Sequence, residues 1–337
     1  MKVSRKVFAT SAVSALSSIA VIRAPARAAQ FQMKIGHNLP VDHPVNVRSV
    51  QMWDAVRKET AGQLDVQIFP NNQLGGDSAM LSQVRSGALQ FMFAGSGPLS
   101  SLHNLCAIEE TPFVWRTNAD ALRAMDNDLG DYVRKELRAK TGLVSMRHEW
   151  LLGFRQITSS NHPIRVAEDL VGFKIRVSAS RIILDTFRAL GASPVPLNFS
   201  ESYTAMQTHV VDGQEGPYST IELGRLYEVQ KYLSVSNHIW GSYFLIANGD
   251  AWKSLPGDVQ AVIEKNAEKY ALLQRRDEEI LDASVSNKLK RQGLAFNECD
   301  VASFRTKLAS QDFYVHTKAE YGDPAWSLME KYSGKIG

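Results

Sequence analysis

Apolar and polar positions repeat with two periods along the chain, and each period predicts one type of element. Leu64, Val66 and Ile68 alternate with polar residues, which is the pattern of a half-buried strand. After Pro44 the apolar positions recur at helical spacing. The first part of the chain therefore predicts strand, helix, strand, helix and strand, over residues 33–37, 44–60, 64–68, 77–87 and 90–93. This order favours a mostly parallel sheet with helices on its faces.

The same patterns continue to the end of the chain. They predict a helix over residues 118–137 and strands near 143–146, 153–158, 173–177 and 243–247. The longest helical pattern covers residues 256–291, and a helix of this length would span about 54 Å. Because such a helix is longer than one small domain, we expect it to contact two. We predict two α/β lobes with a cleft between them.

Length and composition agree with two folded domains. The chain has 337 residues, of which 44% are hydrophobic, and this apolar content excludes a disordered protein. Its 38 basic and 35 acidic residues give a formal net charge of +3, which is weak support for binding nucleic acid. The charge is uneven, because residues 1–29 contain five basic residues and no acid. Without this segment the formal charge is −2.

The N-terminal segment has the order of a secretory signal peptide. A basic start precedes the apolar stretch Val7–Ile22, and Ala26-Arg27-Ala28 then forms a small-residue cleavage site, so we predict cleavage after residue 28. The apolar stretch is short for a membrane anchor. Ser4–Phe8 also resembles a degenerate twin-arginine signal. We therefore expect a soluble periplasmic protein.

Two cysteines are too few for a disulfide scaffold or a cysteine zinc site. Cys106 and Cys299 either pair in the oxidising compartment or remain two separate buried thiols, and the sequence leaves both alternatives open.

Signatures of catalysis and of metal or cofactor binding are nearly absent. The eight histidines form no HExxH motif, and no phosphate-binding glycine loop is present. Gly95-Ser96-Gly97 lacks the spacing of a nucleophile elbow, and we expect it to be a turn that lets the backbone approach another group. We therefore expect a protein that is not an enzyme and that uses no metal or cofactor.

Two arginines lie on predicted strands in apolar surroundings. Arg155 is in Gly153–Thr158 and Arg176 is in Lys174–Val177. A buried guanidinium without a partner is costly. Each arginine therefore either pairs with a carboxylate of the chain or binds an anionic ligand, since a guanidinium matches a carboxylate through two parallel hydrogen bonds.

Several motifs resemble those of one family. The segments Asp169–Val177, Leu190–Gln207, Val211–Glu215 and Tyr227–His238 occur in the order and spacing of the solute-binding proteins of TRAP transporters. Phe69–Asp77 and Gln83–Gly87 resemble motifs of the first half of that family. The resemblance covers essentially the whole chain after the predicted signal peptide.

The resemblance implies a two-lobed periplasmic-binding-protein-like α/β fold of type II style, with hinge strands and a long helix that spans both lobes. We place the signal peptide at 1–28, lobe I at 29–152 plus about 241–275, and lobe II at 153–240 plus about 276–337. The implied function is periplasmic capture of a small organic acid by cleft closure and its delivery to a membrane permease, by a monomeric receptor. A sensor subunit that presents its ligand to a signalling partner, and a periplasmic organic-acid hydrolase or isomerase with Glu215 or His238 as base, are the alternatives.

The resemblance also implies a set of site residues. Arg176 matches the principal arginine that binds the ligand carboxylate, and Arg155 matches a second arginine beside it. Asn38 matches a loop that supplies a polar contact, Phe199 an aromatic that packs on the ligand, and His238 a residue near the cleft. The predicted ligand-binding residues are Arg176, Arg155, Phe199, Asn38, Gly216, His238, Gly95 and Ser96.

Two glycines depart from the family pattern. Gly216 stands where many relatives have an asparagine, and Gly95 stands where sialic-acid binders have a glutamate. Because both departures remove polar side chains and add space, we expect an acid with an apolar or aromatic remainder near Phe199 rather than a polyhydroxylated sugar acid.

Overall fold

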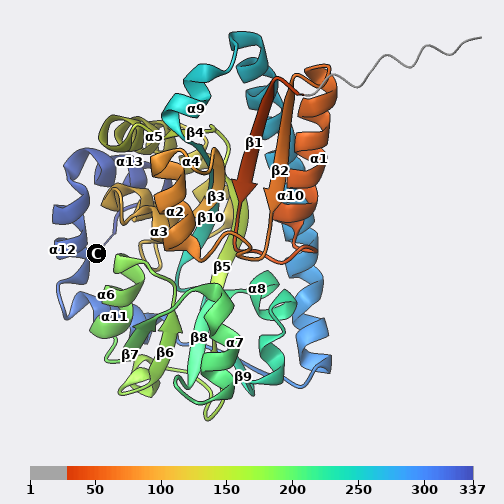
Figure 1. The fold of residues 1–337 in the computed structure, drawn as a ribbon. Coiled ribbons are helices and arrows are strands. Elements are labelled where there is room, and N and C mark those ends of the chain that lie inside the picture. Colours follow the sequence, from red (N-terminus) through yellow and green to blue (C-terminus); the bar gives the residue numbers. More distant parts are fainter. Residues whose placement is uncertain (1–28, 337) are drawn as a thin grey trace, which may run out of the picture.

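The computed structural model describes residues 29–336, which form two lobes connected along one side (Figure 1). The predicted signal peptide, residues 1–28, lies outside the described residues. The two lobes share one continuous path of strands, in the order β2-β1-β3-β10-β5-β8-β6-β7. The predicted two-lobed α/β architecture is confirmed.

Lobe I is built on β2, β1, β3 and β10, with helices on both faces of the sheet. β1 pairs in parallel with β2 and β3, whereas β10 runs antiparallel to β3. Along β3, Phe91 and Phe93 face one core, and Met92 and Ala94 face the other. The elements of this lobe are β1 (Phe31–Gly36), α1 (Pro44–Glu59), β2 (Leu64–Phe69), α2 (Asp77–Ser86), β3 (Phe91–Gly95), α3 (Ser96–Leu99), η1 (Asn104–Glu110), α4 (Asn118–Met125), α5 (Asp128–Thr141), β4 (Val144–Ser145), β10 (Trp240–Ala247) and α9 (Gly249–Ser254).

Lobe II contains a second group of strands with its own two cores. β6 pairs in parallel with β7 and β8, and β9 pairs in parallel with β11. Its elements are η2 (Ala167–Leu170), β6 (Lys174–Val177), α6 (Arg181–Ala189), β7 (Ser193–Pro196), α7 (Phe199–Gln207), β8 (Gly213–Pro217), α8 (Tyr218–Leu223), η3 (Leu226–Glu228), β9 (Tyr232–Val235), β11 (Ala295–Glu298) and α11 (Val301–Ala309).

Strand β5 (Trp150–Ser159) belongs to both lobes. Residues 150–154 pair with β10, and residues 155–159 pair with β8 and β9. The register with β10 skips Leu152, and the next residue, Gly153, has a φ of 84°. This left-handed conformation is accessible to glycine without strain, and it produces a bulge where the strand leaves lobe I.

The 35-residue helix α10 (Gly257–Arg291) runs along both lobes, as predicted (Figure 1). Ile263 and Ala271 pack into a core of lobe I, and Val285 and Leu289 pack into a core of lobe II. Between these two apolar stretches, the buried residues of the helix are polar: Gln274, Arg275 and Glu278. The composition of the helix therefore follows the three environments that it crosses.

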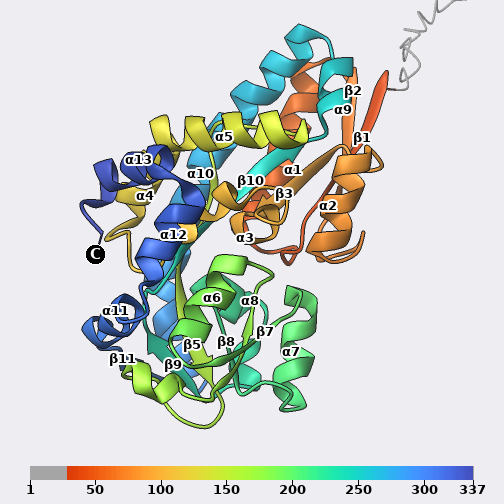
Figure 2. The ribbon, with the colours of Figure 1, turned by 90° about the vertical axis from the view of Figure 1, so that its left-hand side faces the viewer.

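The end of the chain differs from the predicted domain boundaries. α11 packs in lobe II, where Phe304 and Leu308 enter a core. α13 (Asp323–Ser333), which follows α12 (Phe313–Tyr321), packs against α4 and α5 of lobe I, as Figure 2 shows. Trp326 and Met329 are buried in that lobe I core. Residues 276–337, which we assigned to lobe II, are thus divided between the lobes, because the helix pattern shows that α13 has an apolar face but not which surface covers it.

Two smaller expectations are also resolved. The predicted helix 118–137 is two helices, α4 and α5, separated at Asp126 and Asn127. Both cysteines are free thiols: Cys106 is buried in lobe I, while Cys299 lies against a core of lobe II. The alternative of two separate thiols is therefore correct.

Candidate ligand-binding site

A cavity of about 50 Å³ lies between the two lobes. Lobe I contributes residues that follow β1, start α2 and end β3, and lobe II contributes residues from β6, β8 and the start of α7. The shared strands β5 and β10 close the cavity at the back. Six of the eight predicted site residues line it. The full lining is Asn38, Leu39, Asp77, Gly95, Pro98, Glu110, Leu152, Arg155, Arg176, Ser178, Phe199, Glu215, Gly216, Pro217, Thr220, Gly241, Ser242 and Tyr243.

Arg176 is a buried cation without an acidic partner among residues 29–336. It lies on β6 with 4% of its surface exposed, and its Nε and Nη2 donate to the backbone oxygen of Leu197 at 3.1 and 2.7 Å. Burial lowers the pKa of Arg176 to about 10, although Glu215 and Asp77 oppose the change. The guanidinium is charged at neutral pH, and no carboxylate of the described residues forms an ion pair with it.

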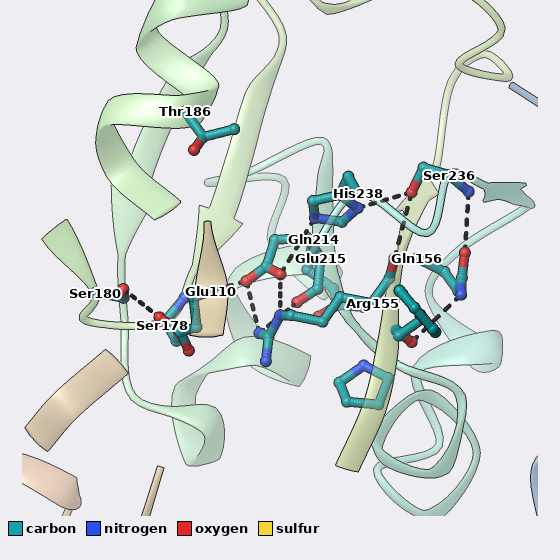
Figure 3. Close-up of polar contacts among 12 residues, drawn as sticks. Glu110, Arg155, Gln156, Ser178, Ser180, Thr186, Gln214, Glu215, Ser236 and His238 are labelled. Carbon is teal, nitrogen blue, oxygen red and sulfur yellow. Dashed lines mark hydrogen bonds and ion pairs between the residues drawn. The ribbon is translucent and has the colours of Figure 1, made fainter. Parts of the chain in front are cut away.

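Arg155 already has a carboxylate partner. Its Nε and Nη2 donate to the two carboxylate oxygens of Glu215 on the adjacent strand β8, the second contact being 2.7 Å long (Figure 3). Despite its burial, the carboxyl of Glu215 has its pKa held well below the ordinary value by Arg155 and His238. The reading in which Arg155 pairs within the chain is therefore confirmed. Arg155 still lines the cavity, so its contact with a ligand stays a prediction.

His238 lies behind this ion pair and does not line the cavity. Its Nδ1 is 2.8 Å from the Oγ of Ser236, and its Nε2 is 3.6 Å from Glu215 (Figure 3). Burial lowers the pKa of His238, which keeps the ring neutral. In the structure His238 Nε2 is beyond hydrogen-bond distance of Glu215 and has no hydrogen-bond partner among the described residues.

Asn38 is one member of a buried polar group on the lobe I side. Its Nδ2 donates to Asp77 Oδ2 at 3.0 Å, and Tyr243 donates to its Oδ1 at 2.6 Å. The other oxygen of Asp77, Oδ1, is buried and accepts no hydrogen bond from the described residues. Burial raises the pKa of the Asp77 carboxyl.

Sequence reasoning did not identify Asp77 or Tyr243 as site residues. We interpreted Asp77 only as the start of a helix and Tyr243 only as part of an apolar strand. The signal available for Asp77 was its position directly after Gly75-Gly76 within a family-like motif. No local pattern marks Tyr243, because it reaches Asn38 from a strand more than 200 residues away.

The remaining predicted residues occupy different places. Gly95, Gly216 and Phe199 line the cavity. A Cβ atom at Gly216 would lie 3.1 Å from side-chain oxygens of both Gln214 and Thr220. A side chain at this position would require the ends of Gln214 and Thr220 to shift by a few tenths of an ångström, and the expectation of added space at Gly216 stays a prediction.

Ser96 does not line the cavity but connects the lobes. Its Oγ donates to one oxygen of Glu110 at 3.0 Å, and Ser180 of lobe II donates to the other at 2.6 Å (Figure 3 shows the latter). On another side of the cavity, His43 of lobe I is hydrogen-bonded to Ser219 of lobe II at 3.3 Å. The lobes are therefore in contact around the cavity, as in a closed conformation.

The aromatic residues near the hinge are part of the protein core. Trp150, Phe154 and Trp240 pack into the cores of lobe I and do not line the cavity. The only phenyl ring among the cavity-lining residues is that of Phe199, which packs against a core of lobe II.

Comparison with known proteins identifies the family. A family model described as "Bacterial extracellular solute-binding protein, family 7" matches residues 35–313. The chain belongs to this family. Its members are extracytoplasmic receptors rather than enzymes, and the fold and the TRAP resemblance inferred from the motifs agree with it.

Curated relatives of the chain are periplasmic binding proteins. The C4-dicarboxylate-binding periplasmic protein DctP of Rhodobacter capsulatus is 33% identical over 258 residues, which cover 75% of each chain. The 2,3-diketo-L-gulonate-binding periplasmic protein YiaO of Escherichia coli K12 is 27% identical over 303 residues, or 89% of this chain and 92% of that one.

Solved structures of TRAP periplasmic solute-binding proteins superpose over nearly all of both lobes. The protein from Polaromonas sp. JS666, bound to D-erythronate, is 29% identical with a TM-score of 0.86, covering 90% of this chain and 100% of that one. The protein from Sulfurospirillum deleyianum, bound to succinate, is 25% identical with a TM-score of 0.84, covering 91% and 99%. Within residues 29–336, no helix combines the length and apolar character needed to cross a bilayer.

Proposed function

We propose that this chain is the periplasmic receptor of a TRAP transporter and that it captures a small organic acid whose carboxylate binds Arg176. The observation that carries this proposal is the buried guanidinium of Arg176, which lines the cavity between the lobes and has no ion-pair partner among the described residues. An anion in the cavity would supply that partner. A guanidinium can bind it through parallel hydrogen bonds in surroundings that exclude water.

The polarity of the cavity supports an acid that also has a hydroxyl group. Asp77 presents an oxygen without a donor, and a ligand hydroxyl would satisfy it. A hydroxy acid therefore fits better than the acid with an apolar or aromatic remainder that the sequence favoured. The D-erythronate complex of a relative agrees with this ligand class.

The proposed mechanism is capture by closure. Arg176 and Phe199 belong to lobe II, whereas Asn38 and Asp77 belong to lobe I, so one ligand would contact both lobes. Closure around the shared strands β5 and β10 removes water and strengthens the contacts of the guanidinium. Glu215 does not fit the role of a general base, because Arg155 binds both of its oxygens.

The partner and location follow from the family. We propose that residues 1–28 are a signal peptide that directs export, with a twin-arginine route as one possibility, and that the exported protein is a monomer. It would deliver its ligand to the membrane permease of a TRAP transporter. The contact with Arg176 would be the same in a sensor subunit, and the genes beside this one would distinguish the two uses.

Calorimetric titration tests the proposed ligand contact. Wild-type protein is titrated with D-erythronate, succinate, pyruvate, galactonate and benzoate, and native mass spectrometry of fresh protein identifies any acid carried through purification. Arg176→Ala removes a desolvated guanidinium and should weaken binding by about 2–5 kcal/mol, or roughly 30- to several-thousand-fold. Arg188→Ala is the matched control, since Arg188 is exposed on α6. Wild-type affinity in Arg176→Ala would refute the proposal.

A further inference from the structure

Two buried glutamates meet at one serine directly behind the ligand cavity. Glu109 lies near the end of η1, Glu149 precedes β5, and Ser242 lies on β10 beside the β5 bulge. Both glutamates have no exposed surface, and Ser242 is 1% exposed. Ser242 also lines the cavity. The two acids therefore lie at the junction of the lobes, and Ser242 separates them from the proposed anion site.

Counting hydrogen atoms shows that this cluster needs an additional proton. The Oγ of Ser242 lies 2.8 Å from Glu109 Oε1 and 2.7 Å from Glu149 Oε2. A hydroxyl has one hydrogen, so it can donate to only one of the two carboxylates. The other short oxygen–oxygen contact requires a proton on a carboxyl group. Glu109 Oε1 accepts a further hydrogen bond from the backbone N–H of Ser242 at 3.0 Å.

The other two carboxylate oxygens, Glu109 Oε2 and Glu149 Oε1, are buried and have no hydrogen-bond donor among the described residues. The nearest cation is Arg134 on α5, whose Nη1 is 3.8 Å from Glu149 Oε1. That guanidinium also donates to the backbone oxygen of Met125 and to the carboxylate of Asp131. One shared cation at this distance does not neutralise two buried carboxylates.

The other groups around the pair add no free positive charge. Arg275 on α10 donates to the backbone oxygen of Glu149, but its charge is paired with Asp126, which precedes α5. On η1, burial keeps the thiol of Cys106 protonated by raising its pKa, and Glu110 accepts hydrogen bonds from two serines. The surroundings therefore favour one negative charge on the pair over two.

We propose that Glu109 and Glu149 hold one proton between them. This proton limits the pair to one negative charge, so that the cavity in front of it can accept an anion. The consequence for binding rests on the proposed function, whereas the proton itself does not. Loss of the proton would add a negative charge beside Ser242. Anion affinity should then fall as the pH rises, and a bound anion should in turn favour retention of the proton.

Burial and mutual repulsion act in the direction that this proposal needs. Both effects raise the pKa of Glu109, and burial raises the pKa of Glu149. The pH dependence of stability is that expected for a buried acid, because the folded state retains the proton at a pH where the unfolded chain has lost it. Stability is lost as the pH rises toward the pKa of the folded state.

The proton is tested on ligand-free protein by infrared spectroscopy. The wild type should show the carbonyl stretch of protonated carboxylic acids at about pH 7, to which other buried acids such as Glu278 and Asp282 also contribute. The difference spectra of Glu109→Gln and of Glu149→Gln against wild type should each show the loss of one component of this band. In either variant the new amide can donate the hydrogen bond that the proton provides. Glu268→Gln is the control, because Glu268 is exposed. A wild-type spectrum unchanged by both substitutions would overturn the proposal.

The effect on binding is measured by titrating D-erythronate and succinate at two pH values, one below and one above the pH at which the infrared component of the Glu109–Glu149 pair is lost. A unit charge about 10 Å from the anion, at an effective dielectric constant of about 20, should lower wild-type affinity roughly ten- to twentyfold once the proton is lost. Glu109→Gln should show a much smaller loss. Identical pH dependence in both proteins would overturn the link to binding. If wild-type protein binds neither acid, the proposed ligand class fails, while the infrared result still decides the proton.

Discussion

Gly97→Ala should prevent full closure of the lobes without disturbing either lobe. Gly97 is on α3 of lobe I and faces Ser180 at the start of α6 in lobe II. A Cβ atom at Gly97 would lie 2.6 Å from the Cβ of Ser180 and 3.1 Å from Oε2 of Glu110. Carbon atoms in contact are about 3.5–4.0 Å apart, so the lobes would have to separate by about 1 Å at this point.

The size of the effect follows from this overlap. Ser180 is held in place by its hydrogen bond to Glu110, so it cannot move away without losing that contact. Overpacking of this kind costs about 1–3 kcal/mol. If the cost falls only on the closed form, ligand affinity should drop by roughly 5- to 150-fold. The melting temperature without ligand should change little, because alanine is a better helix former than glycine.

Calorimetry gives the affinity, and small-angle scattering with saturating ligand shows whether the lobes close. Gly257→Ala is the matched control, because a Cβ atom at Gly257 meets no heavy atom within 4 Å. Ser180→Gly removes the Cβ atom that opposes Gly97. In a Ser180→Gly background, Gly97→Ala should therefore lower the affinity less than it does in the wild type. Wild-type affinity in Gly97→Ala would refute the account of closure.

Three further substitutions test the site. Glu215→Gln should destabilise the fold by about 3–5 kcal/mol at neutral pH, because it leaves Arg155 buried without its carboxylate. Because Arg155 lowers the pKa of Glu215, the stability that this pair contributes is complete above the ordinary glutamate pKa of about 4.3 and is lost as the pH falls further. In denaturant unfolding, the difference in unfolding free energy between wild type and Glu215→Gln should therefore shrink in acid. A difference that stays constant with pH would contradict the ion-pair explanation. Asp77→Asn should weaken binding of D-erythronate more than that of succinate, and equal losses in calorimetry would remove Asp77 from hydroxyl recognition. Arg176→Lys keeps the charge but loses the two-pronged geometry, so its affinity should lie between those of wild type and Arg176→Ala; wild-type affinity would show that charge alone is sufficient.

Local patterns predicted much of the secondary structure. The alternation around Leu64–Ile68 and the helical repeat after Pro44 correspond to β2 and α1. These predictions succeed because each element must bury one face, and the spacing of apolar residues records that face whatever packs on it. The same patterns failed where a break left no strong signal, as between α4 and α5.

The polar site shows where the sequence was insufficient. Motif order selected Arg176, but the same reasoning could not decide between a carboxylate of the chain and a ligand for Arg155. Its partner, Glu215, is 60 residues away and becomes adjacent only because β5 and β8 pair antiparallel. Asp77 likewise joins the site through Asn38, from a different element.

The sequence by itself therefore determined most of the elements and the two-lobed family, and it selected Arg176 as the candidate arginine. These features depend on local periodicity and on motifs that can be recognised along the chain. Only the tertiary structure decided which charges are already paired, which side chains lie beside Gly216, and that α13 returns to lobe I. The physical reason is that pairing and packing depend on residues far apart in the chain, which the fold brings within hydrogen-bond and van der Waals distance.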